Sequence, residues 1–407
     1  MYILTRNILG LHYFEDYAFL IDYFGNTIKL TALQTKIIEA IMQDNDFEII
    51  LNTLVDKLKA SKIIAKCYID QFVKSFGDYF TYSNTLNLMD DLSTNIEITG
   101  EVGKRYPHDL TISLTNLCGQ KCKHCLSNSV YKNAREIPYD QLYNFLDKIK
   151  GKVAQICLTG GEPLLYGSIG QLLDTFKNVY RFSIVTSGYK LENISDKIIQ
   201  QLYYIQVSIH GGNAEEHDDF VQMKGSFQQV DSFIKRLQDL KANFVVVTQA
   251  KSNGLEHLES IIKYCIRTNI KKIIIGELSQ VGRARNLHIW ESYDRYLIRQ
   301  NIIYLSNKYK EQIEVLVDDE MDKKSEHNQE FFECGAGRWK WYINEWGEIF
   351  PCMLSKNHIY KMGDIKNESY GQLIDNSYEF RKKENYWNEN AHDLYKFCNN
   401  MKGLKQR

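Results

Sequence analysis

The chain has 407 residues, of which 44% are hydrophobic and 25% charged, a length and composition typical of two or three globular domains. A formal net charge of −1 gives no electrostatic reason to expect general binding to nucleic acid. The sequence contains no apolar stretch long enough to span a membrane, and its first residues lack a signal-peptide pattern. We therefore expect a cytoplasmic protein, in which cysteines serve packing, catalysis or metal binding rather than disulfides.

Residues 1–90 have the pattern of a small domain in which short strands precede three helices. Two apolar runs flank Gly25 and Asn26, which predicts a β-hairpin. Thr31 and Gln34 have the spacing of a capping box at the start of a helix, and two further amphipathic segments follow. We expect a winged-helix-like domain, which is either a generic packing domain or a module that binds an extended peptide at a strand edge.

Residues 107–310, after a polar segment at 91–106 that we predict to be a linker, alternate between strand-like and helix-like patterns. Six β/α units predict a parallel sheet with helices outside it, either as an open doubly wound sheet or as a partial barrel. Both folds bind ligands at the carboxyl ends of their strands. Residues 320–407 are aromatic-rich and irregular, and we predict that they form a third domain.

Three of the nine cysteines lie in apolar patterns and are predicted to be packed core thiols, namely Cys67, Cys157 and Cys265. Another three directly follow the first strand of the alternating region, with the spacing C-x3-C-x2-C. They are Cys118, Cys122 and Cys125. The last three are scattered through the C-terminal region, at Cys334, Cys352 and Cys398. The close spacing of the second group predicts a metal site.

The number of cysteines in this group indicates which kind of metal site is expected. A structural zinc site takes four ligands, whereas a cubane iron–sulfur cluster is held by one cysteine per iron. Three cysteines can thus hold three irons and leave one open to an outside amine and carboxylate. Zinc with an outside ligand and chance clustering are the alternatives.

The C-x3-C-x2-C group resembles the signature of the radical S-adenosylmethionine (SAM) superfamily, and further motifs of that family follow at later strand ends. The segments GGEP, VTSG and VSIHG resemble its second-, third- and fourth-strand motifs. The resemblance implies a [4Fe-4S] cluster that binds SAM and gives a 5′-deoxyadenosyl radical. It assigns SAM binding to Gly160, Gly161, Glu162, Pro163, Ser187, Ser208, His210 and Lys224.

The sequence departs from the family pattern at four positions, one of which is Ser187, in place of the asparagine of the third-strand motif. His124 replaces the usual aromatic residue before the third cysteine, and His210 replaces an aspartate. Val221 occupies the position of an arginine near the SAM carboxylate. Lys224 is the candidate replacement, although a lysine is not an equivalent bidentate clamp. A glycine–arginine pair, Gly282-Arg283, resembles the segment that follows the sixth strand in the family.

The C-terminal cysteines resemble the opening of a SPASM/twitch extension, in which Cys334, Gly347 and Cys352 have the matching spacing. The dense cysteine block of a full SPASM domain is missing. The resemblance therefore implies a truncated, twitch-like domain with one auxiliary iron–sulfur cluster, to which Cys398 would add a third ligand. Alternatively, Cys334 and Cys352 are remnants in a packed hairpin and Cys398 is a tail thiol.

Together the three regions resemble radical SAM maturases of ribosomally synthesised and post-translationally modified peptides (RiPPs), notably sactisynthases. The N-terminal region resembles the RiPP recognition element that binds a leader peptide. The implied fold is an α/β partial (β/α)6 TIM-like barrel with an N-terminal winged-helix-like domain and a small C-terminal iron–sulfur extension.

The resemblance implies an oxidoreductase that joins a cysteine sulfur to an α-carbon in a precursor peptide, as in sactipeptides. Carbon–carbon cross-linking, another thioether and epimerisation are the alternative reactions, and a non-catalytic peptide-binding iron–sulfur protein is the alternative class. The expected partners are the precursor peptide and an electron donor such as flavodoxin or ferredoxin, with neither nucleic acid nor membrane. No catalytic side chain is predicted.

Overall fold

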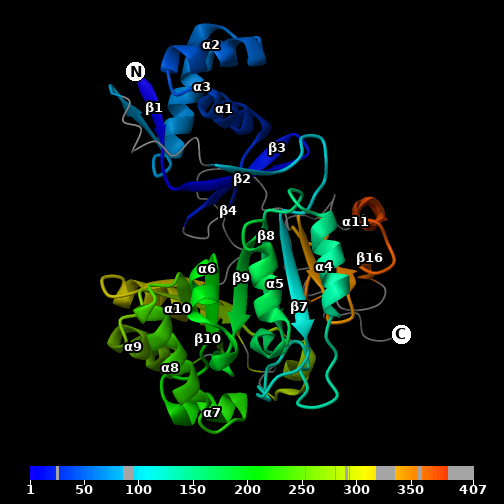
Figure 1. The fold of residues 1–407 in the computed structure, drawn as a ribbon. Coiled ribbons are helices and arrows are strands. Elements are labelled where there is room, and N and C mark those ends of the chain that lie inside the picture. Colours follow the sequence, from blue (N-terminus) through cyan, green and yellow to red (C-terminus); the bar gives the residue numbers. More distant parts are fainter. Residues whose placement is uncertain are drawn as a thin grey trace. The chain divides into compact units, whose positions relative to one another are not determined.

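Figure 1 shows the computed structural model of the protein. The structure describes residues 1–23, 27–85, 96–252, 254–279, 281–288, 292, 294–317, 335–354 and 360–383. The chain divides into two compact units. The first contains residues 1–109 and 149–154, and the second contains residues 110–148 and 155–407.

The first unit combines two small sheets with three helices. A four-stranded sheet has the order β4-β3-β2-β6, and β1 pairs antiparallel with β5. The strands are β1 (Tyr2–Thr5), β2 (Ile8–Phe14), β3 (Tyr17–Asp22), β4 (Thr27–Lys29), β5 (Phe80–Ser83) and β6 (Glu97–Gly100). The helices are α1 (Ala32–Gln43), α2 (Phe47–Leu58) and α3 (Lys62–Ser75).

Local sequence signals explain this arrangement. β3 and β4 pair antiparallel as the predicted hairpin requires, although its turn lies outside the described residues. The capping box at the start of α1 is confirmed, because the Thr31 side chain accepts from the Gln34 N–H and the Gln34 side chain accepts from the Thr31 N–H. The three helices bury one apolar face each in a shared core, to which they contribute Ile37, Ile41, Ile50, Leu54, Ile69 and Phe72.

Two details of this unit differ from expectation. Residues 97–100, within the segment predicted to be a linker, form β6 and pair in parallel with β2. The hydropathy pattern does not predict this strand, because Ile98 is exposed while the polar Thr99 is buried. Thr99 Oγ1 lies 3.1 Å from Nδ1 of His12. The prediction that Cys67 is a core thiol is wrong, since it lies on the exposed side of α3.

The second unit is built on a ten-stranded sheet with the order β13-β12-β11-β10-β9-β8-β7-β14-β15-β16. Strands β8 to β13 pair in parallel with their neighbours. This part of the sheet consists of β7 (Asp109–Thr115), β8 (Gln155–Gly160), β9 (Arg181–Thr186), β10 (Tyr204–Ser208), β11 (Phe244–Ala250), β12 (Lys272–Glu277) and β13 (Glu314–Val317). All six predicted strands are present, and the predicted α/β fold is confirmed.

Helices follow the strands in the expected alternation. They are α4 (Tyr139–Lys148), α5 (Ile169–Phe176), α6 (Asp196–Gln201), α7 (Ala214–Val221), α8 (Ser226–Asp239), α9 (Glu256–Arg267) and α10 (Arg295–Tyr309). Helices α4 and α5 lie over the strands β7 to β9, and the arrowheads of β7 and β9 point to the same edge (Figure 1). β13 is a further parallel strand that the six-unit prediction did not include. It lies after residue 310, where the second domain was predicted to end, and before residue 320, where the third was predicted to begin.

A short C-terminal meander extends this sheet beyond β7. It consists of β14 (Lys340–Ile343), β15 (Glu348–Phe350) and β16 (Gly363–Asp364), followed by α11 (Tyr370–Lys383). Trp339 and Trp341 are buried in it, whereas Trp346 is exposed at the turn. Gly347 completes that turn with a positive φ of 81°. Packing therefore explains Trp339 and Trp341 but not Trp346.

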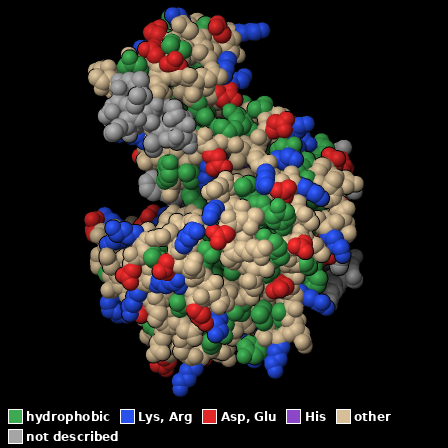
Figure 2. Space-filling view, in the orientation of Figure 1, with side chains coloured by type: hydrophobic (Ala, Val, Ile, Leu, Met, Phe, Trp, Pro, Cys, Tyr) green, Lys and Arg blue, Asp and Glu red, His purple; other side chains and the backbone are tan. Residues whose placement is uncertain are grey.

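The surface agrees with the composition. On the face shown in Figure 2, basic and acidic side chains are interspersed. Among the described residues, no helix is both long and apolar enough to cross a membrane.

Candidate functional site

The loop that carries Cys118, Cys122 and Cys125 is anchored by backbone hydrogen bonds on both of its sides. The Cys118 N–H donates to the Val130 carbonyl at 2.9 Å. The N–H groups of Lys121 and Lys123 donate to carbonyls at the end of α7, at 2.9 and 3.1 Å. The loop thus stands at the carboxyl end of β7, at the sheet edge where this fold binds ligands.

The predicted Gly282-Arg283 pair holds the same loop from the far side. The Arg283 N–H donates to the Cys125 carbonyl at 2.9 Å, and the guanidinium donates to the carbonyls of Cys122 at 2.9 Å and Ser129 at 2.8 Å. Gly282 has a φ of 61°, and a Cβ there would lie 2.2 Å from the Cys125 oxygen. Only glycine permits this close approach.

The three thiols lie close enough to influence one another. Burial raises the pKa of Cys118, and the neighbouring Glu162, Cys122 and Cys125 raise it further. Burial raises the pKa of Cys122 to about 12, which Arg283 opposes. The free thiols of Cys118 and Cys122 are therefore protonated at neutral pH, and metal binding would have to displace their protons.

These residues fit an iron–sulfur cluster. The thiolates of a bound cluster need compensating positive charge, and the half-buried Arg283 guanidinium stands beside Cys122, with its buried Nη2 atom lacking a hydrogen-bond partner. Within the described part of the chain, no three His, Cys, Asp or Glu side chains converge on one metal ion. A cluster does not require such convergence, because each thiolate binds a different iron.

The GGEP segment at the end of β8 comes into direct contact with the end of β7. Gly160 has a φ of 144°, and a Cβ there would lie 2.2 Å from the Thr115 oxygen. A Cβ on Gly161 would lie 2.3 Å from the Leu117 oxygen. Gly161 N–H donates to Thr115 and Glu162 N–H to Leu117, at 2.6 and 2.8 Å. The two glycines thus fix the strand end to the segment that leads into the cysteine loop.

The side chain of Glu162 joins the ends of β8 and β9. One carboxylate oxygen accepts from Thr186 Oγ1 at 2.7 Å and the Leu164 N–H at 3.2 Å. The other accepts from Ser187 N–H at 2.9 Å and Ser187 Oγ at 2.6 Å. Burial raises the pKa of Glu162, and the hydrogen bonds from Ser187 and Thr186 oppose that rise. Each carboxylate oxygen already has two donors from the protein. The side chain therefore links the ends of β8 and β9 through hydrogen bonds.

The other predicted SAM-binding residues differ in exposure. Pro163 is buried at the start of a short helical turn after β8, and Ser208 ends β10 half-buried. His210 is buried, whereas Lys224 is exposed in the turn after α7. Val221, at the position of the family's arginine, is fully buried, and its carbonyl accepts from the cysteine loop.

His124, within the cysteine loop, packs against a second histidine and a phenylalanine. The ring centre of His124 lies 4.6 Å from that of His210 and 4.8 Å from that of Phe220. Burial lowers the pKa of His124 to about 4 and that of His210 well below its ordinary value. Lys251 lies 4.3 Å above the Phe220 ring, and burial lowers its pKa to about 8. The two histidines are neutral at physiological pH, so they add no charge at the site.

A buried polar chain connects this region to the loop and was not predicted from the sequence. Gln120 Nε2 donates to Ser226 Oγ at 2.7 Å, and His217 Nε2 lies 3.2 Å from the same hydroxyl. His217 Nδ1 accepts from the His210 N–H, which leaves the imidazole proton on Nε2. The only sequence signal for these contacts is a polar residue, Gln120, between two of the cysteines. This signal does not indicate which residue Gln120 bonds.

The structure describes only part of the predicted auxiliary site. Cys352 follows β15 half-buried, whereas Cys334 and Cys398 lie outside the described residues. The auxiliary cluster and its ligands therefore stay predictions.

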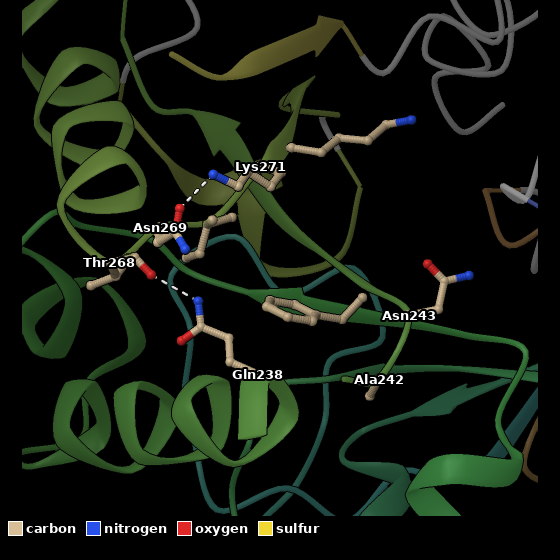
Figure 3. Close-up of a pocket in the computed structure, with 9 residues that line it drawn as sticks. Gln238, Ala242, Asn243, Thr268, Asn269 and Lys271 are labelled. Atoms are coloured by element: carbon tan, nitrogen blue, oxygen red, sulfur yellow. Dashed lines mark hydrogen bonds between the residues drawn. The ribbon is translucent and has the colours of Figure 1, made fainter. Parts of the chain in front are cut away.

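The cavity shown in Figure 3 lies away from the cysteine loop. It has a volume of about 470 Å³ and is lined at the amino ends of β11 and β12, where Phe244 and Lys272 lie. Two of its polar side chains bond within the lining, since Gln238 donates to the Thr268 carbonyl at 2.7 Å and Lys271 donates to the side chain of Asn269. We regard the strand-end site as the functional one, because three thiols, a carboxylate and a guanidinium lie near one another there.

Comparison with known proteins identifies the alternating region. Residues 112–265 match the radical SAM superfamily. Residues 112–265 form a radical SAM domain. Proteins of this family use a [4Fe-4S] cluster and SAM.

Two proteins from Bacillus subtilis are similar in sequence to this chain. The sporulation killing factor maturation protein SkfB is 22% identical over 280 residues, which cover 68% of this chain and 66% of the relative. The antilisterial bacteriocin subtilosin biosynthesis protein AlbA is 24% identical over 287 residues, which cover 68% of this chain and 62% of the relative. The match thus covers less than two thirds of either relative's length.

The solved structure of Streptococcus suis SuiB bound to its precursor peptide SuiA has the same fold. It aligns with a TM-score of 0.62 at 17% identity and covers 93% of this chain and 88% of that one.

The close approach at Gly161 makes a testable prediction. Gly161→Ala would drive a Cβ into the Leu117 carbonyl and displace the segment that leads to Cys118. We expect about tenfold less iron per chain after anaerobic reconstitution, measured together with sulfide. Gly167→Ala is the matched control, because a Cβ there meets no atom within 4 Å in the same β8–α5 connection. A Gly161→Ala protein with the iron content of the wild type would contradict this account.

Proposed function

We propose that this protein is a radical SAM enzyme that modifies a ribosomally made precursor peptide by linking a cysteine sulfur to an α-carbon. One observation carries the proposal: three thiols lie on a loop that is clamped at the carboxyl edge of a radical SAM sheet. The names of SkfB and AlbA, which refer to maturation of a killing factor and biosynthesis of a bacteriocin, support a peptide substrate.

The chain's own residues would have separate roles in this reaction. Cys118, Cys122 and Cys125 would hold the cluster, which with SAM supplies a 5′-deoxyadenosyl radical that removes a hydrogen atom from the peptide. Glu162 would fix the ends of β8 and β9 through its four hydrogen bonds, so that the surrounding backbone is placed for SAM. Ser208 would contact SAM from the end of β10.

The remaining assignments of SAM-binding residues are part of the same proposal. They cover Gly160, Gly161, Pro163, Ser187, His210 and Lys224. Cys334, Cys352 and Cys398 would hold the auxiliary cluster, whose chemistry would be thiolate binding and the acceptance of one electron. A cytoplasmic flavodoxin or ferredoxin would supply the reducing electron, in a compartment that keeps these thiols reduced.

The first unit would bind the leader of the precursor. β4 ends the sheet order β4-β3-β2-β6, and it is the outer strand among the described residues of that sheet. Such an edge can accept an extended peptide as an added strand. The SuiB structure with its precursor peptide bound supports this assignment, since SuiB shares the fold. We accordingly assign residues 1–90 to leader recognition, 107–310 to the radical SAM barrel and 320–407 to the auxiliary-cluster domain.

The reaction is tested by mass spectrometry of a candidate precursor peptide after anaerobic incubation with SAM and dithionite. We expect loss of two hydrogens per link and the disappearance of one free thiol for each link. The Cys118→Ala protein is the control and should leave the peptide unchanged. An unchanged mass with deuterium uptake from heavy water would instead indicate epimerisation, and two-hydrogen loss with all thiols free would indicate a carbon–carbon link.

Leader binding is tested at the β4 edge. Leu30 N–H donates to the Ala18 carbonyl of β3, and bonding alternates along an antiparallel strand, so the Thr27 N–H faces away from β3. Thr27→Pro removes that donor, and we expect at least about tenfold weaker binding of a fluorescent leader peptide, measured by anisotropy.

Thr27→Ala keeps the donor and should bind the leader as the wild type does. Equal leader affinity of the Thr27→Pro protein and the wild type would count against strand addition at β4.

A further inference from the structure

Cys125 differs from the other two loop cysteines in the donors that face its sulfur. Ser129 Oγ lies 2.9 Å from Cys125 Sγ, and the Ser129 N–H donates to the same sulfur at 3.5 Å. Cys118 Sγ accepts one backbone N–H, from Gln120 at 3.4 Å. Cys122 Sγ lies 3.4 Å from Gln120 Oε1, an acceptor that cannot donate to a thiolate. A hydroxyl donor therefore stands at Cys125.

The local backbone explains how Ser129 reaches this position. Asn128 has a φ of 52°, in the left-handed region that asparagine tolerates, so the chain turns back toward Cys125 after three residues. The Ser129 carbonyl accepts from Arg283 Nη1 at 2.8 Å, and the Cys125 carbonyl accepts from the Arg283 N–H at 2.9 Å. Arg283 thus holds both ends of the turn.

Ser129 is also shielded from water. Its exposed fraction is 7%, so water competes little for its hydroxyl. When Cys125 ligates iron it is a thiolate, which can only accept, and the hydroxyl must be the donor. A charge-assisted hydrogen bond in a shielded place is stronger than one between neutral groups.

We propose that Ser129 is a positioning residue whose hydroxyl bonds the Cys125 thiolate and sets the reduction potential of the cluster. Reduction adds a negative charge to the cluster and its sulfurs. A donor to a ligand sulfur stabilises that more negative state and raises the potential, because hydrogen bonds to the sulfurs are among the factors that set it. The inference rests on the cluster part of the proposed function and needs no peptide substrate.

The test uses the full-length reconstituted protein and an EPR-monitored redox titration without peptide. Ser129→Ala removes only the hydroxyl, and we expect its midpoint potential to shift to a more negative value with the iron content of the wild type. Ser129→Thr keeps the hydroxyl and should retain the wild-type midpoint. Thr175→Ala removes an exposed hydroxyl on α5 and should also leave the midpoint unchanged.

An unchanged midpoint in Ser129→Ala would overturn the inference. If that variant loads too little iron to measure, Ser129→Thr decides: full iron loading with the wild-type midpoint supports the role of the hydroxyl, and a shifted midpoint overturns it. Failure of the proposed function has a different result, since a wild-type protein that forms no EPR-active cluster would exclude the cluster itself.

Discussion

The candidate site depends on backbone contact between neighbouring strand ends. Gly160 and Gly161 press against the carbonyls of Thr115 and Leu117, and Gly282 presses against that of Cys125. Each approach is closer than any side chain permits. The cysteine loop is therefore held by main-chain atoms and by the Arg283 guanidinium, and the thiols remain available for a ligand.

Buried polar groups then give this edge its chemical character. Glu162 is satisfied entirely by donors from the protein, and His217 by the His210 N–H and Ser226. Arg283 is different, since one of its nitrogens is buried without a hydrogen-bond partner beside Cys122. A partly buried cation with one unpaired nitrogen suits a ligand that carries negative charge, as a cluster with thiolate ligands does.

The sequence predicted much of this organisation because strand periodicity and motif spacing are local signals. Local patterns were enough to predict the capping box of α1, the six strands of the alternating region and the position of GGEP at a strand end. Ser129 and Gln120 were not, because their partners are chosen by how the loop turns in space. Thr99 and Cys67 show a further limit, since hydropathy alone cannot tell which face of an edge strand or helix is covered.

The central claim is that the cluster on Cys118, Cys122 and Cys125 has one iron open to SAM. It is tested most directly by electron–nuclear double resonance of the reduced full-length protein with SAM labelled at its amino nitrogen or carboxylate oxygen. The account predicts a hyperfine coupling of each label to the cluster. Absence of coupling in a sample where equilibrium dialysis shows SAM to be bound would contradict it.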